Sequence, residues 1–147
     1  MTKKLYHISK SNKIKSMSPS IPNNFFTKNG YEENKTKRIS FSPSIDGCIL
    51  GVNVKEGDEY FVYELLNINN KFLKQPSKKE VPDVKLTKEI WYLSNCKVRL
   101  VGKIKIGKPK GPDLYFKYGN NTAITGLWHY KWVEKYNKDI IEYMSKF

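Results

Sequence analysis

Short apolar segments of β type, separated by polar stretches with proline or glycine, constrain the fold of this chain most. Residues 59–66 (EYFVYELL) are rich in aromatic and branched side chains, as strands are. Residues 98–106 (VRLVGKIKI) alternate apolar side chains with Lys or Gly, the pattern of a half-buried strand. Such segments do not alternate regularly with long helices, which argues against a doubly wound parallel sheet. The sequence therefore predicts an α+β fold with mixed, mainly antiparallel sheets.

The N-terminal half adds more strands and short helices to this prediction. Three further strands are expected, over residues 5–8, 38–42 and 89–93. Pro43 ends the second of them because proline has no backbone donor, and Ser44 is a suitable N-cap for a short helix over residues 45–50. Another helical turn is expected over residues 12–17. The polar residues 18–37 predict a long loop, a kind of segment that often closes over a ligand.

The last third of the chain predicts a connector over residues 107–121 and then a helix. The helix is indicated by large apolar residues that recur at every fourth position: Trp128, Trp132, Tyr136, Ile140 and Met144. This spacing is typical of one face of an amphipathic helix of about twenty residues. We expect that face to pack on the sheet or on a second subunit, forming a homo-oligomer. The alternative is an aromatic and lysine-rich face for nucleic acid.

Length and composition predict a single domain. The chain has 147 residues, of which 39% are hydrophobic, enough for one core. We expect the core in residues 1–106 and the connector and helix in residues 107–147. No run approaches the roughly 18–20 apolar residues of a membrane span, so a soluble, cytoplasmic protein without membrane contact is expected. Cys48 and Cys96 lie in no CxxC or Cys/His cluster, which predicts two free thiols and no metal site.

The formal net charge of +13 leaves two interpretations open. It could serve a nucleic acid or an acidic protein partner. However, of the 27 basic residues only Arg38 and Arg99 are arginine, and specific phosphate or base recognition favours the rigid fork of Arg. Abundant lysine together with abundant asparagine is also what an AT-rich coding sequence produces.

Three short segments carry polar groups that strands could direct into a cleft. They are residues 5–9 (LYHIS), 38–44 (RISFSPS) and 87–93 (TKEIWYL). Singly they are ordinary: His7 suits a structural role, the serines suit turns and caps, and Glu89 suits a strand entrance. Brought together, a histidine, a hydroxyl-rich turn and a lone glutamate can hold a sugar and stabilise positive charge on it.

In this order the segments resemble the ADP-ribosyltransferase superfamily, and in particular its small rifamycin ADP-ribosyltransferase group. The likeness runs from about residue 5 to residue 106 and rests on four short motifs: Leu5-Tyr6-His7, Ile39-Ser40-Phe41-Ser42, Tyr60-Phe61-Val62-Tyr63-Glu64 and Val98-Arg99-Leu100-Val101-Gly102. The resemblance implies an ADP-ribosyltransferase-like fold and NAD as the substrate.

The resemblance also implies roles for two catalytic candidates. His7 would hydrogen-bond the ribose or adenylate side of NAD. Glu89 would bind a hydroxyl of the nicotinamide ribose and stabilise the developing oxocarbenium ion. Independent chemistry supports the second role, because a carboxylate in a dry site stabilises a cationic sugar preferentially in the transition state.

Further residues are implied as contacts for NAD. Ser40 stands where many members have a tyrosine that stacks on nicotinamide, and Ser42 and Ser44 would hold the ribose and shape the site. Phe41 and Tyr31 are candidates for an aromatic wall. Arg38 or a lysine would bind the pyrophosphate.

Two departures from the family pattern leave the acceptor open. Thr87 stands where arginine-modifying members carry a second glutamate, and residues 67–70 lack the acid that the rifamycin group uses. We favour an NAD-dependent mono-ADP-ribosyltransferase acting on a protein or nucleic-acid acceptor, since His7 and Glu89 are both present. The alternatives are a catalytically inactive relative that acts through its basic surface as a binding module or inhibitor, for example in phage–host conflict, and a nucleic-acid-binding protein of unrelated mechanism.

Overall fold

The computed structural model describes residues 4–118 and 120–136, which form three antiparallel sheets. The largest sheet has the order β1 (Tyr6–Ser9), β4 (Glu59–Leu65), β7 (Cys96–Pro109) and β10 (Trp128–Lys135), and β2 (Ser16–Met17) also pairs with β7. The second sheet has the order β3 (Ile39–Phe41), β6 (Ile90–Tyr92) and β5 (Leu73–Lys74). The third is a hairpin of β8 (Leu114–Tyr118) and β9 (Asn121–Thr125).

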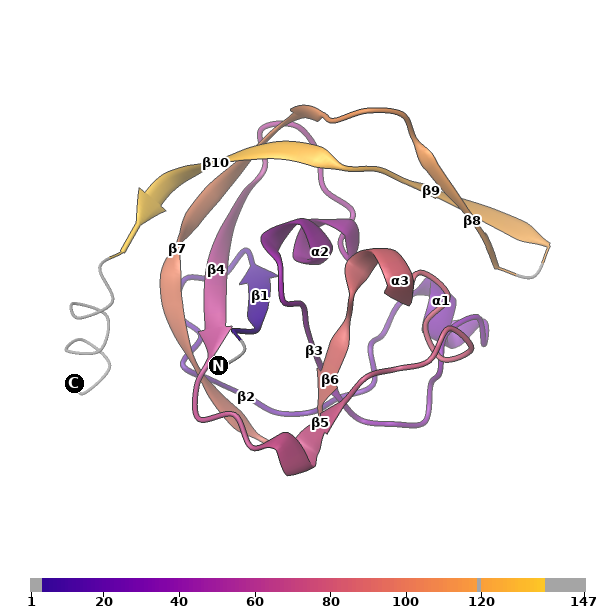
Figure 1. The fold of residues 1–147 in the computed structure, drawn as a ribbon, viewed down its shortest axis with the longest axis horizontal. Coiled ribbons are helices and arrows are strands. Elements are labelled where there is room, and N and C mark those ends of the chain that lie inside the picture. Colours follow the sequence, from indigo (N-terminus) through magenta and orange to yellow (C-terminus); the bar gives the residue numbers. More distant parts are fainter. Residues whose placement is uncertain (1–3, 119, 137–147) are drawn as a thin grey trace.

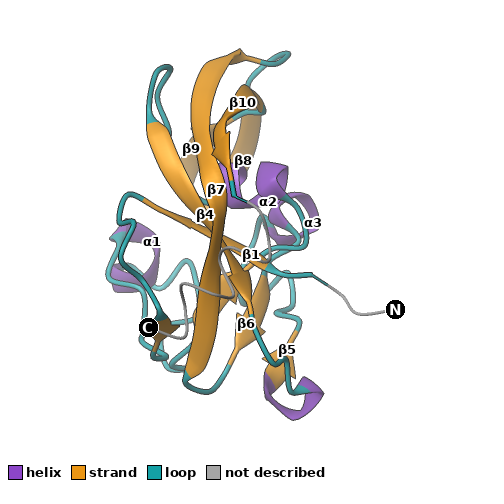
Figure 2. Ribbon diagram, turned by 90° about the vertical axis from the view of Figure 1, so that its left-hand side faces the viewer, coloured by secondary structure: helices purple, strands orange, loops and turns teal. Residues whose placement is uncertain are grey.

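The helices of the described residues are short: α1 (Phe25–Lys28), α2 (Ile45–Leu50), α3 (Val84–Thr87) and the 3-10 helix η1 (Asn70–Phe72). Figure 1 shows α2 lying within the curve of the largest sheet, with β3 and β6 beside it and the β8–β9 hairpin extending away from β10. In the turned view of Figure 2, β7 runs through most of the height of the molecule. Within residues 4–118 and 120–136, no helix has the length and apolar character needed to cross a membrane.

Two clusters of buried side chains hold the sheets together. The first lies between the largest sheet and the second sheet, and contains Leu5, Ile39, Phe41, Tyr63, Leu65, Ile90, Tyr92 and Val98. The second packs α2 and the turn after it on the largest sheet, and contains Ile8, Ile49, Val54, Tyr60, Val62, Ile104 and Ile106. Burial of these apolar side chains is the main favourable term in the folding of the chain.

A pair of backbone hydrogen bonds joins the two sheets at β1. The Tyr6 amide donates to the Ser42 carbonyl over 2.8 Å, and the Ser42 amide donates to the Tyr6 carbonyl over 2.9 Å. Because β3 ends just before Ser42, this bridge holds β1 beside β3. It thereby sets His7 next to the cleft face of the second sheet.

The prediction of an α+β fold is wrong, because the described residues are mostly antiparallel strands and their α-helices span only four to six residues. One expected short helix is correct: α2 covers Ile45–Leu50, and the side chain of Ser44 caps it by accepting from the Gly47 amide. The helical turn expected over residues 12–17 is not formed. Ser16 and Met17 instead pair with Lys97 and Cys96 of β7.

The predicted C-terminal helix is also wrong where the structure describes it, because Trp128–Lys135 form strand β10. The partly buried side chains there are Trp128, Tyr130 and Trp132, at every second position, and they pack on the second core cluster. A recurrence at every fourth residue is also a multiple of the strand period of two, so the wider spacing alone did not separate the two structures. Ile140 and Met144 lie outside the described residues. Since residues 128–135 form a strand, they supply no helical face for the expected contact with a second subunit.

The expected connector over residues 107–121 is likewise different. β7 continues to Pro109, and β8 pairs with β9 from Leu114↔Thr125 to Tyr118↔Asn121. Pro109, Gly111 and Pro112 come before β8, so they precede the hairpin rather than replace it with a loop. The strands expected at residues 59–66, 89–93 and 98–106 are confirmed as β4, β6 and the centre of β7.

Candidate functional site

A cleft of about 870 Å3 lies between β1, β3, the entrance of β6 and the foot of the β8–β9 hairpin. Its volume falls in the range of roughly 300–1,000 Å3 that is typical of ligand sites. His7, Ser40 and Glu89, three of the polar residues singled out from the sequence, all line it, as does Arg38. A smaller cavity of about 100 Å3 is lined by His7, Ser40 and Glu89 and also by Phe41 and Ser42.

Strand alternation explains why these side chains share one face. On β3, Ile39 and Phe41 are buried in the core, so Ser40 points to the opposite side of the sheet. On β6, Ile90 and Tyr92 belong to the same core, and Trp91 lies opposite Ser40 in the register. Arg38 and Glu89, two residues before Ser40 and Trp91, therefore belong to the cleft face as well.

His7 is held in a defined tautomer. Its Nδ1 lies 3.1 Å from the Ser40 carbonyl, which can only accept, so Nδ1 carries the proton and donates it. The Phe41 ring meets the imidazole edge-on, with 6.0 Å between ring centroids. Burial lowers the pKa of His7, against the effect of the hydrogen bond to Ser40. The ring is therefore neutral at pH 7, and its Nε2 is an acceptor for a ligand hydroxyl.

Glu89 is fixed from both sides at the start of β6. Its Oε2 accepts from the Trp91 indole Nε1 over 2.9 Å, and its amide donates to the Thr87 hydroxyl over 3.2 Å. Lys88, immediately before it, has a positive φ of 53° and ends α3 in the left-handed conformation. That sharp change of direction leads the chain from α3 into β6 and delivers Glu89 to the cleft.

A close junction of α2, β3 and α3 supports this turn. The buried Ser42 hydroxyl donates to the Thr87 carbonyl over 2.8 Å. Gly47 of α2 packs directly on both groups: a Cβ there would lie 2.3 Å from the Thr87 carbonyl oxygen and 2.1 Å from the Ser42 hydroxyl oxygen. Ser42 thus has a structural partner, and Gly47 permits the approach because it has no side chain.

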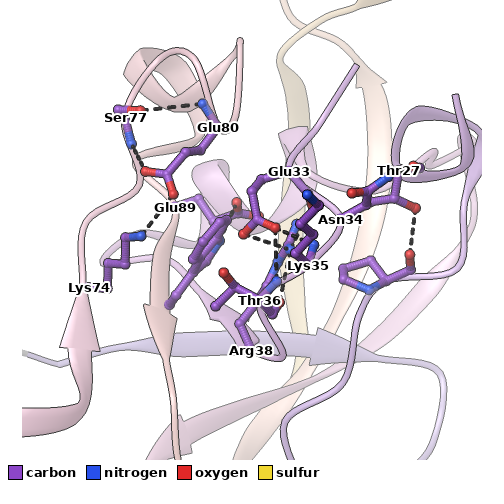
Figure 3. A network of polar contacts seen from close by, with 12 residues as sticks. Thr27, Glu33, Asn34, Lys35, Thr36, Arg38, Lys74, Ser77, Glu80 and Glu89 are labelled. Carbon is purple, nitrogen blue, oxygen red and sulfur yellow. Dashed lines mark hydrogen bonds and ion pairs between the residues drawn. The ribbon is translucent and has the colours of Figure 1, made fainter. Parts of the chain in front are cut away.

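Arg38 is buried and already engaged. It is 3% exposed, its Nη1 donates to the carbonyls of Glu33 and Thr36, and its guanidinium lies 4.1 Å from the centroid of the Trp91 ring. Figure 3 shows Arg38 beside Glu33 and Thr36. In this arrangement the side chain shapes the cleft wall and holds the preceding loop.

The remaining candidates from the sequence occupy other positions. Tyr31 packs on Phe25, with ring centroids 6.0 Å apart, and is not among the residues that line the cleft. Ser44 serves as the cap of α2, and Phe41 is 2% exposed in the core, next to the small cavity. The structure therefore brings together His7, Ser40, Arg38 and Glu89, and leaves Tyr31 and Ser44 outside the cleft.

Three acids that line the cleft were missed by the sequence analysis: Glu32, Asp83 and Asp113. Glu32 comes from the loop over residues 18–37, and Asp83 stands at the start of α3 without a side-chain capping bond. Burial, then the charges of Glu89 and Asp83, raise the pKa of Glu32 to about 7. Burial, then Glu89, also raise the pKa of Asp83. The signal in the sequence was the pair Glu32-Glu33, the only acids in that loop.

The cysteines and the acids give no sign of a metal site in the part of the chain that the structure describes. There, no group of three or more His, Cys, Asp or Glu side chains is arranged to hold a metal ion. Cys48 and Cys96 are both free thiols, as predicted. Burial raises the pKa of the Cys48 thiol to about 12, so it stays protonated and unreactive at neutral pH.

No family model, no curated protein and no solved structure matches this chain. The resemblance to ADP-ribosyltransferases therefore stays a prediction from the sequence. Any functional conclusion must come from the cleft and its side chains.

Proposed function

We propose that the protein is an NAD-dependent mono-ADP-ribosyltransferase that transfers ADP-ribose to a protein or nucleic-acid acceptor. The observation that carries this proposal is the convergence of His7, Ser40 and Glu89 on one cleft from three distant parts of the chain. The cleft is large enough for a dinucleotide, and an imidazole, a hydroxyl and a carboxylate that could contact a sugar all line it.

Glu89 supplies the main chemical argument. Breaking the bond between nicotinamide and ribose develops positive charge on the sugar, and a fixed carboxylate stabilises that charge most in the transition state. The Trp91 indole holds the Glu89 carboxylate in place, so little reorganisation is needed during the reaction. His7 Nε2 would accept a hydrogen bond from a ribose hydroxyl.

The rest of the cleft suits the other parts of NAD. Apolar and aromatic side chains such as Phe26, Val52 and Trp128 line it and would contact the planar rings. Arg38 is the only basic side chain among the described residues that line the cleft, and it is already bonded. The pyrophosphate would therefore rely on hydroxyl donors such as those of Ser18 and Ser20, which also line the cleft.

The test is release of nicotinamide from NAD, measured by chromatography, with NAD affinity measured separately by calorimetry. Glu89→Gln keeps the shape of the side chain and an oxygen for the Trp91 indole, so the fold should persist. We expect this variant to bind NAD and to lose at least about 100-fold in nicotinamide release. Glu56→Gln, at an exposed position in the turn before β4, is the matched control and should keep the wild-type rate.

Two results would contradict the proposal: no binding of NAD by the wild-type protein, or full turnover by Glu89→Gln. Absence of NAD binding would favour the second candidate, a catalytically inactive binding module. The observation that favours this candidate is the net charge of +13. Among the described residues no lysine lines the cleft, so the basic surface that would bind a partner lies elsewhere on the molecule. Salt-dependent binding to nucleic acid would then be the measurement to make.

A further inference from the structure

The loop over residues 18–37 brings Glu32 into the cleft that Glu89 also lines, close enough for the two charges to interact. The loop is fixed around this residue: the Glu32 amide donates to the Phe26 carbonyl over 3.2 Å, and the Glu33 amide donates to the Glu80 carbonyl over 2.9 Å. The Asn34 side chain also donates to the Thr27 carbonyl over 3.0 Å. Glu32 is thus presented by an anchored segment, with its backbone already in position.

The carboxylate of Glu32 does not hold the fold together through any side-chain contact of the described residues. Among the described residues, none forms a hydrogen bond or an ion pair with it, although it is half-buried. Its neighbour Glu33 differs, because that carboxylate accepts from the amides of Lys35 and Thr36 and so closes the loop. A half-buried carboxylate without a partner costs stability, and its retention in a cleft indicates a role toward a ligand.

The charges that face Glu32 come from three elements. Asp83 faces it from the start of α3, Glu89 from the entrance of β6, and Arg38 from the start of β3. Burial first, and then Glu89 and Asp83, raise the pKa of Glu32, and Arg38 opposes them without reversing the effect. With a pKa of about 7, Glu32 is part ionised at neutral pH and can accept a proton there.

We propose that Glu32 is the general base of the transfer reaction and removes the proton from the attacking group of the acceptor. This inference rests on the proposed function. The nucleophile is a hydroxyl group, of the acceptor or of water, whose oxygen lone pair forms the new bond to C1′ of the ribose. The bond from C1′ to the nicotinamide nitrogen breaks, and its electron pair leaves nicotinamide neutral. The hydroxyl proton passes to the Glu32 carboxylate.

This assignment divides the work between two carboxylates. Glu89 is tied to the Trp91 indole and faces the developing cation, so it acts as a fixed charge. Glu32 has no such partner and is available for a proton. His7 is a weaker candidate for the base, because burial lowers its pKa and one ring nitrogen is committed to the Ser40 carbonyl.

The experiment compares the full-length wild type with Glu32→Gln, Glu32→Asp and the control Glu56→Gln. Nicotinamide release with water as the nucleophile is followed between pH 5 and pH 9, and NAD affinity is measured for each variant. In the wild type the rate should rise with pH through about 7, as Glu32 loses its proton. Glu32→Gln should lose about 100-fold at pH 8 and should also lose the rise with pH, while still binding NAD.

The outcomes separate this inference from the proposed function. A Glu32→Gln variant that keeps the wild-type rate and pH profile would overturn the role of Glu32 alone, provided that Glu89→Gln is inactive. A wild-type protein that neither binds nor cleaves NAD would overturn both. Partial activity in Glu32→Asp, with the rise shifted in pH, would support a base that titrates in the reaction, since a residue with a purely structural role would leave that profile unchanged.

Discussion

Two sets of acidic side chains lie partly or fully out of contact with water, and they differ in what faces them. Glu64 of β4 lies directly opposite Arg99 of β7 in the register, and its Oε2 accepts from Arg99 Nε over 2.9 Å and from Nη2 over 2.7 Å. Glu32, Asp83 and Glu89 instead face one another across the cleft. Glu64 is therefore paired with a cation of the same sheet, whereas the three cleft acids have mainly negative charges as neighbours.

This difference in neighbouring charges distinguishes an acid that stabilises the fold from acids that are placed to interact with a ligand. A buried carboxylate with a two-point arginine partner is stabilised where it lies and gives the register of β4 on β7 a fixed point. At the cleft acids, burial comes first and repulsion between the carboxylates second, and together they raise the pKa of Glu32 and of Asp83; at Glu32 the nearby Arg38 only partly offsets them. Removing charge should therefore destabilise the protein at the first set and stabilise it at Glu32.

The largest expected effect is at the paired set. Arg99→Leu leaves the carboxylate of Glu64 buried without its cation, and we expect the free energy of unfolding to fall by about 3–5 kcal/mol. Denaturant unfolding at pH 7 measures this. The double variant Arg99→Leu with Glu64→Leu should recover most of the loss, because it removes the orphaned charge. A single variant as stable as the wild type would show that the pair contributes nothing to the fold.

A smaller loss is expected at the junction that supports the cleft acids. Gly47→Ala would place a methyl group against the Thr87 carbonyl and the Ser42 hydroxyl, so we expect α2 or α3 to shift at a cost of about 1–3 kcal/mol. Since Thr87 leads into Glu89, NAD affinity and turnover should fall with stability. Gly51→Ala is the control, because its Cβ would meet only ordinary contacts at 3.5 Å or more. Equal stability of the two variants would contradict the account.

The opposite sign is expected at Glu32. Its pKa in the folded protein is about 7, above the ordinary 4.5, so between these values the native state holds a proton that the unfolded chain has released. Stability contributed by this site is therefore lost as pH rises from 4.5 to 7. Glu32→Gln avoids that loss and should be more stable than the wild type by about 1–2 kcal/mol at pH 8, after allowance for solvent screening.

Unfolding curves at pH 4 and pH 8 provide the measurement for Glu32. The two proteins should coincide at pH 4, where the carboxyl group is protonated in both states. A Glu32→Gln variant that is less stable than the wild type at pH 8 would show that the attraction of Arg38 outweighs burial and the like charges at Glu32. In that case the two sets of acids would not differ as described.

Some of the residues that form the cleft could be predicted from the sequence, and others could not. Local signals predicted α2, because Pro43 and Ser44 mark its start. They also predicted Ser40 and Glu89 as cleft residues, because their apolar neighbours on short strands are buried and the polar side chain therefore lies on the other face. The candidate cleft followed once β1 and β3 were joined. Neither Glu32 nor Asp83 could be found this way, because their meeting with Glu89 depends on how two long loops return to the sheet.

The C-terminal strand shows a different limit. Trp128 and Trp132 fit a helix and a strand equally well, and Tyr130 between them decides the question, because it too is partly buried. Pairing with β7 supplies backbone partners for β10 that no pattern in residues 128–135 specifies by itself. Distant pairing therefore decides this region, and an α+β fold was expected because that pairing was not visible in the sequence.

The smallest expected change in the free energy of unfolding is at the surface pair of Lys74 and Glu80, where an acid again has a cation as its partner. Glu80 accepts from Lys74 over 2.8 Å and from the Ser77 amide over 3.0 Å (Figure 3), and the hydrogen bond from Lys74 is the main reason why its pKa is lowered. Its contribution is present above the ordinary carboxyl pKa and is lost as pH falls. Glu80→Gln should therefore lower the free energy of unfolding at pH 8 by up to about 1 kcal/mol and leave it unchanged at low pH. The same Glu→Gln change would then act with opposite signs at Glu80 and Glu32 at pH 8, and equal signs would show that the cation partner is not what separates them.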